Sequence, residues 1–103
     1  MSSRLELLEK LVASGQTDSF GRYALAMEYK KLGRAEEALA AFTVLRERDP
    51  DYLPTYQMVG QLLTELDRPA DARPWLEAGL LLAQRLGNDK TASELAEALE
   101  ELG

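Results

Sequence analysis

The sequence predicts an all-α protein of about six helices arranged as antiparallel hairpins. Apolar residues recur at intervals of three and four along almost the whole chain, which is the spacing of one face of a helix. No segment shows the sustained apolar and polar alternation that is typical of a strand. The connections between the periodic stretches have two to four residues, which is enough to join antiparallel neighbours but too short for crossovers.

Three helices are predicted in the first half of the chain. The first two apolar stripes begin near capping side chains, and the third begins with Glu36 and Glu37 in its first turn, where the helix dipole favours acids. The stripes stop at a glycine or before a proline, and the second runs as far as Leu32. The predicted helices are Ser3–Ser14 with Ser2 or Ser3 as its N-cap, Ser19–Leu32, and Ala35–Arg48.

Three more helices are predicted in the second half. Pro54 and Pro69 suit the first turn of a helix, where no backbone N–H is needed. Pro74 lacks the N–H that would bond to Ala70, so we expect it to bend or delay its helix. The predicted helices are Leu53–Leu66, Pro69–Leu86 and Asp89–Leu102.

The composition of the 103 residues disfavours an enzyme. There is no histidine and no cysteine, which removes the commonest general base, thiolate nucleophiles and the usual zinc ligands. The acidic pairs are interpreted as structural: Glu36-Glu37 stands in a first helical turn, Asp49 and Asp51 flank an inter-helix turn, and Glu100-Glu101 closes a helix. We therefore expect no catalytic residues, no cofactor and no bound metal.

The net charge and the N-terminal residues limit the partners and the cellular compartment expected for this chain. The formal net charge of −6 opposes nonspecific binding to nucleic acid or to an anionic membrane. Glu6 and Glu9 interrupt the apolar stretch near the start, unlike a signal peptide, and no apolar run approaches the roughly 20 residues needed to span a bilayer. Together with the lack of cysteine, these features predict a cytoplasmic protein without nucleic-acid or membrane partners.

A weak internal repeat distinguishes a stack of hairpins from a closed bundle. Three identities and one pair of small residues recur at a separation of 34 residues, and apolar classes agree around them. The pairs are Leu32 with Leu66, Arg34 with Arg68, Ala38 with Ala72, and Ala26 with Gly60. Small residues at these positions allow two helices to cross closely.

At these residues the chain resembles the tetratricopeptide repeat family, whose unit is a 34-residue helix hairpin with a small residue at the crossing. The pattern is carried in 19–52 by Ala26, Tyr29, Gly33, Ala38, Phe42 and Pro50, and in 53–86 by Gly60, Leu63, Ala72 and Leu76. The resemblance implies a right-handed superhelical stack in a single domain, 1–103. Its expected parts are a capping helix in 1–18, repeats in 19–52 and 53–86, and a capping helix in 87–103.

The resemblance also implies a protein–protein interaction module, an adaptor or scaffold that binds a peptide or helix of a partner in a concave groove. The first helices of the two repeats would supply the groove, with apolar, amide and lysine side chains. The predicted binding residues are Phe20, Tyr23, Met27, Lys30, Lys31, Gln57, Met58 and Gln61. Met27 and Met58 stand where the family's carboxylate clamp has asparagines, so that mode of binding is not expected.

Two alternatives remain open from the sequence. The first or the sixth helix could cover part of the same face as core. The chain could instead be a structural subunit that forms a homo-oligomer through an exposed helical edge, because two repeats leave an apolar end at each side of the stack.

Overall fold

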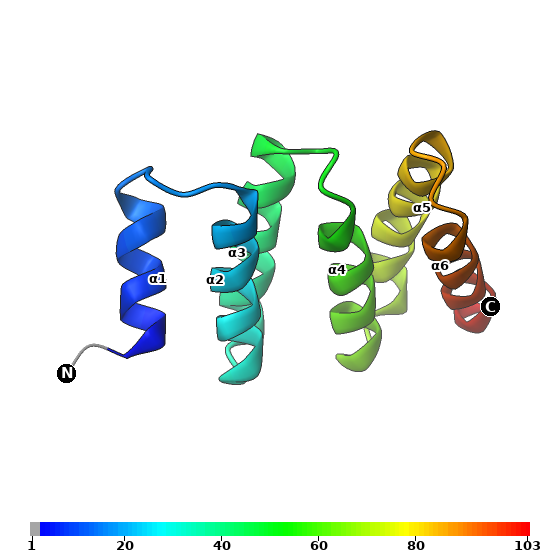
Figure 1. Cartoon of the computed structure of the whole chain (residues 1–103). Coiled ribbons are helices and arrows are strands. Elements are labelled where there is room, and N and C mark those ends of the chain that lie inside the picture. Colours follow the sequence, from blue (N-terminus) through cyan, green and yellow to red (C-terminus); the bar gives the residue numbers. More distant parts are fainter. Residues whose placement is uncertain (1–2) are drawn as a thin grey trace. The chain divides into compact units, whose positions relative to one another are not determined.

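The computed structural model describes residues 3–103, which form six α-helices (Figure 1). All six predicted helices are confirmed, and each predicted end lies within one residue of the observed end. Pro74 does not delay its helix, which begins at Pro69. The helices are α1 (Arg4–Ala13), α2 (Ser19–Lys31), α3 (Ala35–Arg48), α4 (Leu53–Glu65), α5 (Pro69–Arg85) and α6 (Asp89–Leu102).

The chain divides between Pro50 and Asp51 into two compact units. The N-terminal unit contains α1, α2 and α3, and the C-terminal unit contains α4, α5 and α6. The division falls two residues before the boundary predicted between the repeats, and the assignment of repeats and caps stays a prediction. None of the helices in 3–103 has both the length and the hydrophobicity to cross a membrane.

Side-chain caps begin three of the helices. The hydroxyl of Ser3 accepts a hydrogen bond from the Glu6 amide at 3.1 Å, while the other predicted cap, Ser2, lies outside the described residues. Asp18 caps α2 through the Gly21 amide at 3.0 Å, and Asn88 caps α6 through the amide of Thr91 at 3.1 Å. Each cap satisfies an N–H group that the helix itself leaves without a partner.

The helices α2, α4 and α5 end in the same type of turn, in which a residue with positive φ follows the C-cap. The φ angles are 77° at Gly33, 57° at Asp67 and 71° at Gly87. The next amide then bonds to the carbonyl five residues back, as in a Schellman motif. These bonds are Arg34 to Tyr29 at 2.9 Å, Arg68 to Leu63 at 2.8 Å and Asn88 to Ala83 at 2.9 Å. The first two turns lie 34 residues apart, which agrees with the repeat seen in the sequence.

In the N-terminal unit, α2 packs against both α1 and α3. Leu5 and Leu8 of α1 form a buried cluster with Leu25 of α2. On the side of α3, Ala26 and Ala38 are completely buried, which confirms that small residues lie inside this hairpin. The rings of Tyr23 and Phe42 meet edge to face with their centroids 5.8 Å apart.

In the C-terminal unit, α5 packs against both α4 and α6. Gly60 is buried and Ala72 is completely buried. A Cβ added at Gly60 would overlap the Leu76 side chain, lying 2.7 Å from Cγ. At Gly79 an added Cβ would lie 2.7 Å from the Cβ of Tyr56 and 3.3 Å from a methyl group of Leu95. At these two glycines, neighbouring side chains therefore fill the space that a Cβ atom would need.

Two of the predicted apolar stripes include a last residue that does not belong to the buried face of its helix. Leu32 is 50% exposed and Leu66 is 39% exposed, although both continue the apolar pattern. Each is the C-cap of its helix, one residue beyond the last helical position. A residue at this place follows the turn away from the helix, so its side chain leaves the core face.

We predict that Gly60→Ala lowers the free energy of unfolding by about 1–3 kcal/mol, because the added methyl group collides with the packed Leu76 side chain. In a helix, alanine is ordinarily more stabilising than glycine. A loss of stability in this variant would therefore show that the two helices cross closely at Gly60. Urea unfolding followed by circular dichroism measures the change.

Gly21→Ala is the matched control. The Cβ added there meets chiefly the Thr17 hydroxyl, which rotation of that side chain can remove. We expect this variant to be at least as stable as the parent. Equal stability of the Gly60 variant and the parent would contradict the close crossing.

Candidate functional site

A hollow of about 530 Å³ lies along α2, and four of the predicted binding residues line it. Phe20 is 69% exposed at this surface, so the alternative that a neighbouring helix covers it as core is wrong for this residue. Tyr23 and Met27 are half-buried, and Lys31 is exposed. The residues that line the hollow are Arg4, Phe20, Tyr23, Ala24, Met27, Glu28 and Lys31.

Contacts between α1, α2 and α3 hold this hollow in place. The Ser19 hydroxyl donates to Asp49 Oδ2 at 2.6 Å and ties the start of α2 to the C-cap of α3. Arg4 Nε of α1 donates to Glu28 Oε2 at 3.2 Å across the hollow's margin. Arg4 was not among the predicted site residues, because only the packing of α1 against α2 brings it to this surface.

The α4–α6 groove, of about 400 Å³, contains two further predicted residues, Gln57 and Gln61. Gln57 Nε2 donates to Glu94 Oε1 of α6 at 3.5 Å, and Gln61 Nε2 donates to Glu65 Oε1 at 3.0 Å. Here α6 lies beside the predicted face without burying these two residues as core, since Gln57 is half-buried and Gln61 is exposed. The residues that line the groove are Gln57, Gly60, Gln61, Thr64, Glu65, Leu76, Glu94, Leu95, Ala98, Glu101 and Leu102.

The two remaining predicted residues, Lys30 and Met58, are half-buried and line neither surface. The residues of α2 and those of α4 belong to different units, so a single groove that contains them all stays a prediction. Sequence reasoning also missed the glutamates of the α4–α6 groove. The signal was present in the spacing of Glu94 and Glu101, which are two helical turns apart on one face of α6.

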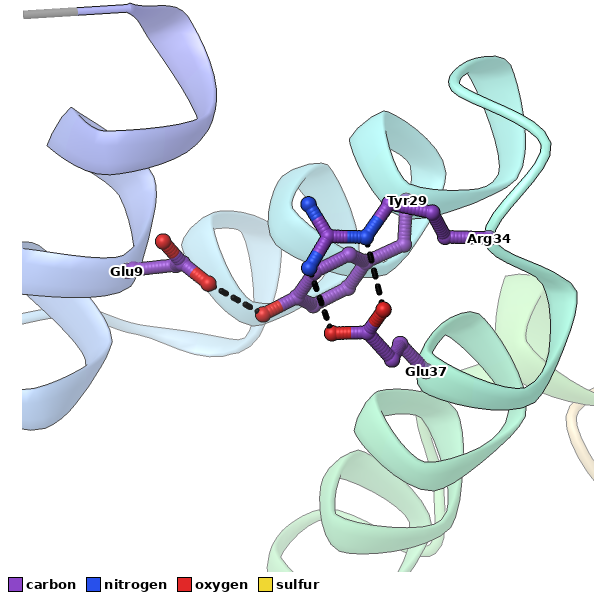
Figure 2. A network of polar contacts seen from close by, with 4 residues as sticks. All are labelled: Glu9, Tyr29, Arg34 and Glu37. Carbon is purple, nitrogen blue, oxygen red and sulfur yellow. Dashed lines mark hydrogen bonds and ion pairs between the residues drawn. The ribbon is translucent and has the colours of Figure 1, made fainter.

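A polar network joins the three helices of the N-terminal unit (Figure 2). Tyr29 Oη donates to Glu9 Oε2 of α1 at 2.6 Å. The Arg34 guanidinium lies over the Tyr29 ring, 5.2 Å from its centroid, and donates two hydrogen bonds of 2.6 and 2.7 Å to Glu37 of α3. The network thus links α1 to the start of α3 through one aromatic ring.

The network also changes the acidity of its members. The hydrogen bond to the Glu9 carboxylate, with a further contribution from burial, raises the pKa of Tyr29 from 10.0 to about 12. The Arg34 guanidinium lowers the pKa of Glu37. These groups stabilise the packing of α1. Within residues 3–103 no cluster of carboxylates is arranged to hold a metal ion.

Comparisons with known proteins agree with this architecture. The tetratricopeptide repeat pattern matches residues 21–52. The TPR repeat-containing protein PA0015 of Pseudomonas aeruginosa is 30% identical over 98 residues, which cover 95% of this chain and 93% of that protein.

Two solved structures are similar as well. A tetratricopeptide repeat domain protein from Salinibacter ruber, solved by NMR in solution, has 44% identity and a TM-score of 0.78 over 82% of this chain and 86% of its own. Protein BPP2914 from Bordetella parapertussis has 28% identity and a TM-score of 0.82 over 99% of this chain and 89% of its own.

The chain therefore belongs to the tetratricopeptide repeat family, as the sequence resemblance indicated. Repeats of this family generally mediate protein–protein interaction and are typically non-enzymatic.

We predict that Tyr29→Phe removes one late step from the alkaline titration of the four tyrosines. The phenol of Tyr29 has a raised pKa in the folded state, so its stabilising effect is complete below pH 10.0 and is lost as the pH rises through about 12. Ultraviolet absorbance of tyrosinate measures the titration.

The same variant should lose about 1 kcal/mol of unfolding free energy at neutral pH, because the hydrogen bond to Glu9 is gone. Tyr52→Phe serves as the control for the titration. An unchanged late step in the Tyr29 variant would contradict the assignment.

Proposed function

We propose that this protein is an adaptor or scaffold module that binds a segment of a partner protein at the surfaces of α2 and α4. The contacts would come from Phe20, Tyr23, Met27 and Lys31 on α2 and from Gln57 and Gln61 on α4. Lys30 and Met58 stay part of the proposal from the sequence alone. The observation that carries it is Phe20, a large aromatic side chain that is 69% exposed at the edge of a hollow.

The chemistry of the α2 hollow favours a mixed segment over a purely apolar one. Phe20 and Met27 offer apolar contact, and a thioether adapts its shape to different partners. Tyr23 presents its ring while its packing on Phe42 fixes its position. Arg4, Glu28 and Lys31 line the same hollow and contribute both signs of charge. A large apolar anchor inside a polar margin is the usual composition of a protein-binding hot spot.

The proposal includes a cytoplasmic location, since the chain has no cysteine. It includes no catalytic step and no nucleic-acid or membrane partner, because the net charge of −6 opposes binding to polyanions. The function assigned to the module is recognition alone.

We predict that Phe20→Ala weakens binding to the partner by about tenfold or more, while the unfolding midpoint changes little, because Phe20 is exposed. Partners are captured from the native host and identified, and each is then titrated against purified parent and variant by isothermal calorimetry.

Leu81→Ala is the matched control, since Leu81 is also 69% exposed but lies on α5, outside the hollow. Partners that bind both variants as tightly as the parent would exclude the α2 hollow as a binding site.

Self-association is the second candidate function, and the outer face of α1 favours it. Leu7 is 53% exposed and Leu11 is 46% exposed, one helical turn apart, and a shallow hollow of about 450 Å³ lies between them with Lys10 and Ser14. Exposed leucines at a helical spacing form the kind of stripe by which two helices pack. A second copy that presents the same stripe would bury both pairs.

If the chain self-associates through α1, replacing both Leu7 and Leu11 by Gln should shift it to monomer and leave helicity unchanged. Sedimentation equilibrium at micromolar concentration measures the mass. The control replaces Leu81 and Leu86 by Gln, which are 69% and 50% exposed elsewhere. A parent chain that is monomeric throughout the range excludes this function.

A further inference from the structure

The α4–α6 groove combines an apolar floor with an acidic rim. Leu76 and Leu95 at its floor are 3% and 1% exposed, and Gly60, which packs against Leu76, also lines it. The rim carries Glu65 from α4 and Glu94 and Glu101 from α6, all exposed. Among residues 3–103, no lysine or arginine lines the groove.

The rim carboxylates have no cationic partner in the part of the chain that the structure describes. Glu65 and Glu94 accept hydrogen bonds from the neutral amides of Gln61 and Gln57. Basic residues of the same unit are engaged elsewhere: Arg68 pairs with Asp71 at 2.9 Å and Arg85 with Asp51 at 2.6 Å.

The two helices that form the groove also lack a basic residue in their last turns, unlike the other four helices. The last turns of α1, α2, α3 and α5 all carry lysine or arginine, which the helix dipole favours, whereas the last turns of α4 and α6 carry none. Because α5 joins α4 to α6 through short turns, α4 and α6 run parallel, and Glu65 and Glu101 stand at the same end of the groove. Arg73 Nη2 donates to the Gly103 carbonyl at 2.9 Å, but Arg73 does not line the groove.

The net charge of the chain is concentrated in this unit. Residues 1–50 contain eight basic and eight acidic residues, and residues 51–103 contain four basic and ten acidic ones. The whole of the −6 therefore belongs to the unit that holds the groove.

We propose that the α4–α6 groove binds a basic amphipathic segment of a partner protein, with apolar side chains on the floor formed by Leu76 and Leu95 and with lysine or arginine side chains beside Glu65, Glu94 and Glu101. This inference rests on the proposed function and adds the chemistry of the partner. Glu94 and Glu101 are seven positions apart and therefore span about 10 Å of helix, so the groove accommodates about two helical turns of the segment. A cation placed beside Glu65 also lies near the last turn of α4, which carries no basic residue of its own.

The test selects binders from a displayed library of random 12-residue peptides on the full chain and titrates the synthesised peptides by fluorescence anisotropy. The expected peptides are rich in lysine and arginine with interspersed apolar residues. Replacing Glu65, Glu94 and Glu101 together by Gln should weaken their binding by about tenfold at 0.05 M salt. The difference should shrink at about 1 M salt, where the screening length falls to about 3 Å.

The matched control replaces Glu77, Glu97 and Glu100 by Gln, which removes the same charge from exposed positions outside the groove. We expect it to change binding by less than about twofold. Circular dichroism of both variants checks that each is folded.

Other results overturn the inference in distinguishable ways. Peptides without basic enrichment, or equal affinity for the two triple variants, show that the groove does not select a basic segment. Peptides that lose affinity with Phe20→Ala but not with the groove variant leave the proposed function intact and exclude this inference. Association of the chain with itself that the groove variant abolishes assigns the groove to a second copy. A library that yields no binder contradicts both the inference and the proposed function.

Discussion

The close packing of helices at small residues is the constraint on which the rest of this structure depends. Ala26 and Ala38 in one unit, and Gly60 and Ala72 in the other, are buried where a larger residue would separate the hairpin. At Gly60 the space beside the backbone is already filled by Leu76. The candidate binding surfaces lie beside these close contacts: Gly60 and Leu76 line the α4–α6 groove, and Tyr23 of the α2 hollow packs on Phe42 of α3.

The two units use polar side chains for different purposes. In the N-terminal unit, Glu9, Tyr29, Arg34 and Glu37 bond to one another and fasten α1 to the hairpin (Figure 2). In the C-terminal unit, the glutamates of the groove bond at most to neutral amides. Charges satisfied inside the protein stabilise its packing, whereas carboxylates left without a cation remain available to a partner. The contrast separates a structural network from a candidate site.

Local rules explain why the helices were predictable to within one residue. Caps such as Asp18 and Asn88, turns at Gly33 and Gly87, and prolines at helix starts act over a few residues and can be read directly from the chain. The exceptions are informative. Leu32 and Leu66 continue the apolar period but lie past the last helical residue, where the turn removes them from the core face. Apolar periodicity indicates which face of a helix is buried. It does not show at which residue the helix ends and that face leaves the core.

The sequence by itself determined the helices, the small residues at their crossings and the family, because each depends on residue type and spacing along one chain. It also named Phe20, Tyr23, Met27 and Lys31, which share one helical face and gather at one hollow. Only the tertiary structure decided which residues of other helices join them. Arg4 lines the α2 hollow, and the glutamates of α6 line the α4–α6 groove, because helices that are distant in sequence pack together. Spacing within a helix cannot encode that proximity, since it arises from contacts between helices.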